Sequence, residues 1–199
     1  MVWTLWRQTV TGLKVLLVAT VLLGIGYPLA VWGVSRLPGL EQHAEGAPLM
    51  AGGRVVGSSL IGVDPVPADP ARDPFFHTRP SASAPDPVGS GDPASTGGSN
   101  LAGGNAELLD AVQQRRNAVA AREGVVPQAV PPDAVTASAS GVDPGISPAY
   151  AALQVPRVAR VTGIPEAALH RLIAQSTSGG VLAERSVNVP ELNAAARHH

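Results

Sequence analysis

The 199-residue chain has no cysteine and a single lysine, Lys14. Without cysteine it cannot form disulfides, cysteine-ligated zinc sites or iron–sulfur clusters, and it has no thiol for catalysis. A phosphate-binding P-loop needs a lysine directly after a glycine, and the D-K-T-G phosphorylation motif of P-type pumps also contains one. Lys14 follows Leu13, so neither motif is present. The chain therefore cannot hydrolyse ATP by either route, and any ATP-driven activity would belong to a partner.

Charged and aromatic residues are also scarce. Charged residues make up 15% of the chain, with 14 basic against 15 acidic side chains and a net charge of −1. Nucleic-acid binding relies on clustered lysine and arginine, so this composition argues against a nucleic-acid partner. Four of the seven aromatic residues lie within the first 32 positions, which leaves a soluble core built mainly of alanine, valine, leucine and isoleucine. Glycine (22) and proline (19) are abundant, so irregular structure is expected.

Residues 15–35 form a run of 21 residues without a charge. About 20 apolar residues suffice for a helix to cross a bilayer core, and the run is longer than the apolar region of a cleaved signal peptide. We therefore predict an uncleaved transmembrane helix, with a kink near Pro28. Basic residues before it mildly favour a cytoplasmic amino terminus. Residue types that favour the membrane interface flank the run: Trp3, Trp6, Arg7, Lys14, Trp32 and Arg36.

After this run, the glycine pair Gly52-Gly53 predicts a turn that leads into a short strand over 54–62. Residues 64–104 are dense in proline, glycine, aspartate and serine, and we expect them to be ordered but irregular. We predict four regions along the chain: a cytoplasmic tail over residues 1–14, a transmembrane helix over 15–35, a polar connector over 36–51 and an extracytoplasmic soluble domain over 52–199.

The rest of the soluble domain has the pattern of helices with a few short strands. Asn105 and Ser147 are good N-caps, and a proline follows the second at the first helical position. The predicted elements are a helix over 106–123, a helix over 148–162 that Pro156 kinks or splits, a helix from Pro165 to Gly179-Gly180, a strand over 187–189 and a terminal helix from Pro190. The pattern indicates an α+β domain that is rich in helix.

Signatures of catalysis are sparse. The chain lacks a G-x-S-x-G elbow, and its five histidines lack metal-binding spacings such as H-x-x-x-H. Serine catalysis would need Ser99 or Ser140 to lie within hydrogen-bond reach of His77 or His170. We expect His77 to be a hydrogen-bonding or surface histidine. A membrane-anchored hydrolase and an anchored stalk with a disordered segment over 64–104 stay open as alternatives.

Three segments are more specific than the composition around them. Taken alone, F-F-H-T-R-P-S-A (75–82) indicates a small apolar cluster with a solvent-facing arginine. The segment S-T-G-G-S-N-L (95–101) is typical of a tight turn before a helix. The serine-rich segment 135–148, followed by Q-V-P-R-V-A (154–159), is typical of turn chemistry and a helix cap.

Together with the predicted membrane helix, six motifs occur in one order: G-S-S-L-I-G (57–62), F-H-T-R-P-S-A (76–82), G-G-S-N-L (97–101), V-T-A-S-A-S-G-V-D-P-G-I-S-P (135–148), Q-V-P-R-V-A (154–159) and V-N-V-P-E-L-N (187–193). This order resembles the C subunits of Kdp potassium-transporting ATPases, the KdpC family, over nearly the whole chain. Departures are modest: Val63 stands where glutamine is usual, and Gly145 where histidine is frequent. The resemblance marks these side chains as partner-contacting or structural: Phe76, His77, Arg79, Gly98, Ser99, Asn100, Ser140, Asp143 and Arg157.

The resemblance implies a non-catalytic accessory subunit of a high-affinity, ATP-driven potassium uptake complex in the bacterial inner membrane. Its implied partners are a potassium-translocating subunit, an ATP-hydrolysing subunit and a small stabilising peptide. It also implies a cytoplasmic amino terminus, a soluble domain outside the membrane, and a role as catalytic chaperone that raises the ATP affinity of the pump subunit.

By the same resemblance, Gln154 contacts ATP together with the partner subunit; no other cofactor is expected. A domain outside the membrane cannot touch cytoplasmic ATP, however, and Gln154 lies on the same side as everything after Ser35. Allosteric coupling through the membrane part would suffice, since a tenfold change in affinity needs only about 1.4 kcal/mol. From the residues alone, a structural role for the Gln154 amide is therefore favoured over nucleotide binding.

Overall fold

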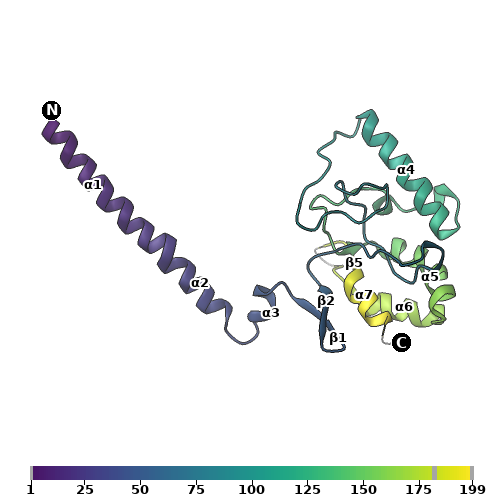
Figure 1. The fold of residues 1–199 in the computed structure, drawn as a ribbon. Coiled ribbons are helices and arrows are strands. Elements are labelled where there is room, and N and C mark those ends of the chain that lie inside the picture. Colours follow the sequence, from purple (N-terminus) through teal and green to yellow (C-terminus); the bar gives the residue numbers. More distant parts are fainter. Residues whose placement is uncertain (1, 181–182, 198–199) are drawn as a thin grey trace. The chain divides into compact units, whose positions relative to one another are not determined.

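The structure is a computed structural model that describes residues 2–180 and 183–197. The chain divides into two compact units, residues 1–47 and residues 48–199, whose elements are labelled in Figure 1. The first unit is helical, and the second combines helices with short strands. The predicted α+β class is confirmed.

The first unit is dominated by one long apolar helix. Helix α1 (Val2–Val21) continues through a π-helical turn (Leu22–Gly26) into α2 (Tyr27–Ser35). Among the described residues this 34-residue helix is the one that is long and apolar enough to cross a membrane. It begins well before the charge-free run, because residues 2–14 contain no proline to stop it. The structure thus extends the predicted helix at its amino end.

The irregularity predicted near Pro28 takes the form of the π-helical turn. The Tyr27 N–H donates to the Leu22 carbonyl, five residues earlier. Pro28 follows in the first turn of α2, where it has no N–H to donate back into the preceding turn. The helix passes the proline without ending.

Arginines stack on tryptophans near both ends of this helix. The Arg7 guanidinium lies 5.0 Å from the centre of the Trp3 ring, and that of Arg36 lies 5.4 Å from the Trp32 ring. Both residue types favour the interface between lipid headgroups and water. Arg36 also pairs with carboxylates in and just after the short helix α3 (Glu41–Ala44), at 3.6 Å from Glu41 and 2.6 Å from Glu45.

The second unit begins with a hairpin of β1 (Pro48–Ala51) and β2 (Arg54–Ser58), which pair antiparallel with a bulge between Leu49 and Met50. Gly52 and Gly53 form its turn with positive φ values of 57° and 76°, as type I′ turns require. The predicted glycine turn is confirmed. Strand β1 lies in a segment that we expected to be a connector, and β2 ends at Ser58 rather than continuing to residue 62.

Helices and a small antiparallel sheet form the body of this unit (Figure 1). The Asn105 side chain accepts from the Glu107 N–H at 2.8 Å and the Ser147 hydroxyl from the Tyr150 N–H at 3.0 Å, so both predicted caps are confirmed. The elements are α4 (Ala106–Glu123), β3 (Gly145–Ile146), α5 (Pro148–Thr162), α6 (Glu166–Gln175), β4 (Thr177–Ser178), β5 (Ser186–Asn188) and α7 (Val189–Ala196), with strand order β3-β5-β4.

Two helices differ in detail from the sequence prediction. Helix α5 includes Pro156 without splitting, and the proline lies on its exposed face. Helix α6 ends at Gln175, before the predicted glycines, because Thr177 and Ser178 pair with β5. Strand pairing here takes precedence over helical periodicity.

The core of the second unit is mostly aliphatic, as the composition predicted. It contains Phe76, Val119, Val130, Ala134, Val135, Ile146, Tyr150, Ala151, Val155, Val158, Leu169, Leu172, Ile173, Val187, Val189 and Leu192. These side chains come from helices α4 to α7, the sheet, the irregular segment before α4 and the segment between α4 and β3. The irregular segment before α4 therefore contributes directly to the core.

Residues 59–105, which we call the strap, contain one short 3-10 turn (Pro70–Arg72) and otherwise irregular backbone. Backbone hydrogen bonds tie the strap to residues 138–142: Gly62 N–H to the Val142 carbonyl at 2.7 Å, and Gly97 N–H to the Ser140 carbonyl at 2.9 Å. Gly62 has to be glycine, because a Cβ there would overlap the Asp143 backbone. The expectation of an ordered but irregular segment is confirmed.

Candidate functional site: a buried polar network under the strap

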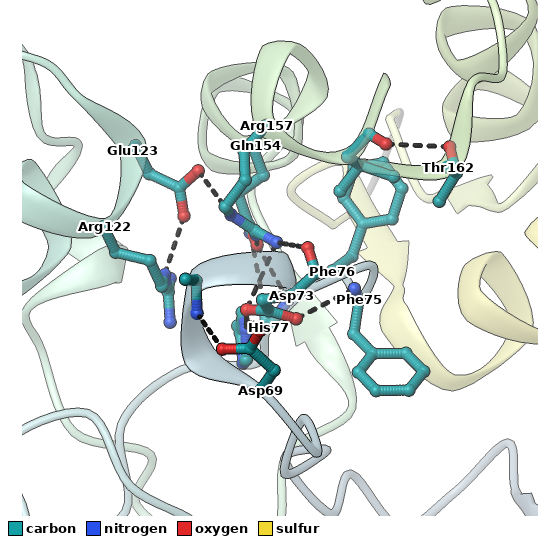
Figure 2. Close-up of polar contacts among 12 residues, drawn as sticks. Asp69, Asp73, Phe75, Phe76, His77, Arg122, Glu123, Gln154, Arg157 and Thr162 are labelled. Carbon is teal, nitrogen blue, oxygen red and sulfur yellow. Dashed lines mark hydrogen bonds and ion pairs between the residues drawn. The ribbon is translucent and has the colours of Figure 1, made fainter. Parts of the chain in front are cut away.

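A buried ionic network joins the strap to α4 and α5. Arg157 of α5 is 4% exposed. Its Nε donates to Glu123 at 2.9 Å, and its Nη1 donates to the Asp73 carbonyl at 2.8 Å and lies 3.2 Å from the Asp73 carboxylate. Glu123 also accepts from Arg122 at 2.7 Å, so that it lies between two arginines in Figure 2. The last turn of α4 is thereby fixed to α5 and to the strap.

His77 lies between two carboxylates of the strap. Its Nδ1 is 2.9 Å from Asp64 Oδ2, and its Nε2 is 2.5 Å from Asp73 Oδ2. Asp64 also accepts from the Thr78 N–H at 2.7 Å. Both ring nitrogens therefore have a carboxylate partner. The prediction of a hydrogen-bonding histidine is confirmed, and the histidine is buried.

Two side-chain amides hold the strap by its backbone. Gln154, which is fully buried, accepts from the His77 N–H at 2.8 Å and donates to the His77 carbonyl at 3.2 Å. Asn193 of α7 accepts from the Phe76 N–H and donates to the Phe76 carbonyl, both at 2.8 Å. Each amide thus pairs with both polar groups of one residue, as a neighbouring strand would. Together the two amides supply the backbone of Phe76 and His77 with the hydrogen bonds that a neighbouring strand would otherwise provide.

The electrostatics of the network favour a protonated His77. Burial alone would lower the pKa of His77, but its hydrogen bonds to Asp64 and Asp73 raise that pKa above the ordinary value. Burial acts to raise the pKa of Asp73, whereas the hydrogen bond from His77, its charge and that of Arg157 lower it below the ordinary value. Both directions describe an imidazolium held between carboxylates. Three carboxylates of the network then face three cations: Asp64, Asp73 and Glu123 with His77, Arg122 and Arg157.

The raised pKa of His77 makes the stability of the second unit depend on pH. Its contribution is complete below the unfolded pKa of about 6.5 and is lost as the pH rises through the higher folded pKa. Asp73 acts in the opposite direction, contributing above about pH 4 and losing its contribution as the pH falls through its lowered folded pKa. We expect the urea midpoint of the full chain in detergent to fall from pH 6 to pH 9. His77→Gln should remove this slope, and the exposed His170→Gln should keep it. A wild-type midpoint that stays constant over this range would contradict the assignment.

A second junction brings together the three segments singled out in the sequence. Arg79 pairs with Asp143 at 3.3 Å and donates to the Thr136 and Ala137 carbonyls at 3.3 and 3.2 Å. The predicted solvent-facing arginine is therefore wrong, because Arg79 is half-buried against residues 136–143. Ser138 is buried and accepts from the backbone of Gly141 and Asp143.

The other motif residues lie around this junction. Gly98 packs closely on Ala139: a Cβ added at Gly98 would lie 3.2 Å from the carbonyl oxygen of Ala139. Ser140 shares a hydrogen bond with Ser138 at 3.2 Å, while Ser99 and Asn100 are exposed. The three motifs thus meet in space. Their glycines allow the backbones to approach closely, and their serines form hydrogen bonds at the junction.

The arrangement does not support serine hydrolysis. Both nitrogens of His77 are taken by carboxylates, and His170 lies on the exposed face of α6. In the described part of the chain, no hydrogen bond joins Ser99 or Ser140 to a histidine. Nor do residues 2–180 and 183–197 contain a cluster of three or more His, Asp or Glu arranged to hold a metal ion.

Several members of the network were missed by the sequence reasoning. They are Asp64, Asp73, Arg122, Glu123, Ser138 and Asn193. Asp73 and His77 have a spacing of four, and Arg122 and Glu123 end a helix, but such pairs are common on protein surfaces. Ser138 and Asn193 lie in motifs that had been singled out, 135–148 and 187–193, but neither residue had been assigned a role.

Comparison with known proteins gives a consistent result. A family model described as "KdpC: K+-transporting ATPase, c chain" matches residues 9–197. A potassium-transporting ATPase KdpC subunit of Kineococcus radiotolerans is 47% identical over 197 residues, covering 97% of this chain and 94% of the relative. Those of Polaromonas naphthalenivorans and Acidobacterium capsulatum are 45% and 42% identical over 187 residues, each covering 92% of this chain.

The fold and the network define a protein with one apolar helix that can span a membrane and a helix-rich unit whose conspicuous polar residues bind one another. The matched region includes most of that helix and nearly all of the second unit. The chain belongs to the KdpC family, the c chains of K+-transporting ATPases. The resemblance drawn from the six motifs is confirmed.

Proposed function

We propose that the chain is a non-catalytic accessory subunit that stabilises the ATP-driven potassium uptake complex Kdp. The observation that carries this proposal is the family match over residues 9–197, through both units. The missing phosphate-binding lysine and the internal pairing of His77 support a role without catalysis. The hydrolase and stalk alternatives are not favoured, because the strap is held by the core and neither serine contacts a histidine.

The proposed topology has the amino terminus in the cytoplasm and the second unit outside the membrane. Arg7 and Lys14 precede the charge-free run, and positive residues favour the cytoplasmic side. After the run, Arg36 is paired with Glu41 and Glu45. The proposed partners are the potassium-translocating subunit, the ATP-hydrolysing subunit and a small stabilising peptide, in the bacterial inner membrane.

We further propose that Gln154 has a structural role and that any effect on ATP affinity is indirect. Its side chain is fully buried, and both of its amide atoms bind the His77 backbone. A nucleotide would have to displace these bonds and open the strap. Coupling through the assembled complex needs no such step, since tenfold tighter ATP binding corresponds to about 1.4 kcal/mol.

Co-purification from native membranes tests the proposed function. The chain would carry a carboxyl-terminal tag, the source cells would grow under potassium limitation, and the membranes would be solubilised gently. We expect a P-type ATPase and a potassium-translocating subunit to co-purify, and potassium-stimulated ATPase activity to disappear when this chain is deleted. Recovery of the chain alone, with pump activity intact without it, would overturn the proposal.

A further inference from the structure

Arg115, in the middle of α4, is a buried charge without a counter-ion. The residue is 9% exposed and lies on the helix face that also buries Val119 and Glu123. Its Nη1 donates to the Val135 carbonyl at 3.4 Å, which is long for such a bond. Its Nε is the one buried side-chain nitrogen or oxygen without a hydrogen-bond partner among the residues that the structure describes. Buried polar groups are normally paired, so this atom indicates an acceptor from outside the chain.

No acidic side chain of α4 is placed to neutralise Arg115. One helical turn before and after it, the helix has the uncharged residues Ala111, Val112, Ala118 and Val119. Across the part of the chain that the structure covers, Arg115 takes part in no ion pair. Burial lowers the pKa of its guanidinium below the ordinary value. An arginine nevertheless stays charged, because its ordinary pKa is above 12.

The surroundings of Arg115 are positively charged. Arg116, the next residue, is half-buried and likewise has no ion pair with any described residue. The carbonyls of residues 135–137 accept from Arg115 once and from Arg79 twice. Asp143 pairs with Arg79 at 3.3 Å. The middle of α4 and the adjoining turn thus have three guanidiniums and one carboxylate, a charge that complements a doubly charged anion.

The free edge of the Arg115 guanidinium determines which chemical group fits. Nη1 is used by Val135, which leaves the N–H groups of Nε and Nη2 side by side in one plane. A carboxylate or phosphate group accepts from both donors at once. A water molecule would accept a hydrogen bond but leave the buried charge uncompensated. Phosphate is favoured over a carboxylate, because its charge of about −1.5 to −2 at pH 7 matches the local excess of two positive charges.

We propose that Arg115 binds a free phosphate ion through Nε and Nη2. The residue keeps a small accessible area, through which an ion in solution reaches the guanidinium. The bound ion connects α4 to the turn at residues 132–138, where the Ser138 N–H donates to the Pro80 carbonyl of the strap. Phosphate therefore stabilises the junction of the motifs. This inference does not depend on the accessory role proposed above.

Equilibrium dialysis of the full chain in detergent against radiolabelled inorganic phosphate tests this proposal. We expect one saturable site in the wild-type chain and an affinity at least about tenfold weaker in Arg115→Met, which lacks both charged donors. Arg160→Met, which removes an exposed arginine from α5, should bind phosphate as the wild type does. Equal affinities of the wild type and Arg115→Met, or no saturable binding to the wild type, would overturn the proposal.

Hydrogen exchange of the wild-type chain gives a measurement that needs no variant. Phosphate should slow exchange in α4 around Arg115 and in residues 132–138, while exchange in α6 should stay unchanged. Uniform slowing across the second unit would contradict the site, because phosphate also stabilises proteins by exclusion from their surfaces. Phosphatidylglycerol in the micelles, without free phosphate, tests a lipid headgroup as the source of the anion. Slowing by the lipid but not by phosphate would likewise overturn the proposal.

Discussion

Replacing Arg157 with methionine should lower the free energy of unfolding of the second unit by about 3–5 kcal/mol. Removing one partner of a buried ion pair leaves the opposite charge buried and unpaired. Glu123 would lose its bond to α5, and the Asp73 carboxylate and carbonyl would lose theirs. The side chains of Glu123 and Asp73 are 0% and 3% exposed, so water cannot replace the lost partner. Such a loss is a large part of the 5–15 kcal/mol typical of a folded domain.

Urea unfolding of the full chain in detergent, followed by pulse proteolysis, measures this effect. Tryptophan fluorescence would not report on the second unit, because all three tryptophans lie in the first 32 residues. Arg160→Met is the matched control, since Arg160 is exposed on the same helix. Equal midpoints for the two variants would show that the Arg157 ion pairs contribute nothing to stability.

Gln154→Leu is expected to cost about 2–5 kcal/mol and to release the strap. The His77 N–H and carbonyl would both lose their partner, and each buried unsatisfied group costs about 1–3 kcal/mol. Asn193→Leu should have a similar effect through Phe76, which it holds in the same way. Faster hydrogen exchange at Phe76 and His77, together with a lower urea midpoint, would be the measured result.

This pair of variants separates a structural role from a nucleotide contact. If Gln154 holds the strap, Gln154→Leu and Asn193→Leu should lower stability and the ATP affinity of the complex in parallel. If Gln154 contacts nucleotide, Gln154→Leu should weaken ATP binding without lowering stability. The complex with Asn193→Leu should then bind ATP with the wild-type affinity. Gln175→Leu, at the exposed end of α6, is the control for replacing a glutamine by leucine.

The network also explains why family motifs lie in apparently irregular sequence. The strap has few regular backbone hydrogen bonds of its own, so side chains from α5 and α7 supply them. His77 belongs to one motif and Gln154 and Arg157 to another, yet the three bind one another directly or through Asp73. A motif here marks one end of a contact whose other end lies elsewhere in the chain.

The sequence by itself determined the elements that depend on local interactions. The charge-free run placed the apolar helix, Asn105 and Ser147 placed two helix starts, and Gly52-Gly53 placed the hairpin turn. The order of the motifs was also sufficient to identify the family. Each local signal is contained within a few neighbouring residues or a single segment, and the order of the motifs follows directly from the chain, so no long-range contact is needed to interpret them.

Only the tertiary structure decided which polar residues are paired. The contact between His77 and Gln154 spans 77 residues and that between Phe76 and Asn193 spans 117, so spacing in the sequence gives no indication of either. Strand pairing at Thr177 also ended α6 earlier than its periodicity indicated. The sequence therefore determined the local elements and the family, while the fold decided the partners, because desolvation makes an unpaired buried charge or amide too costly to leave alone.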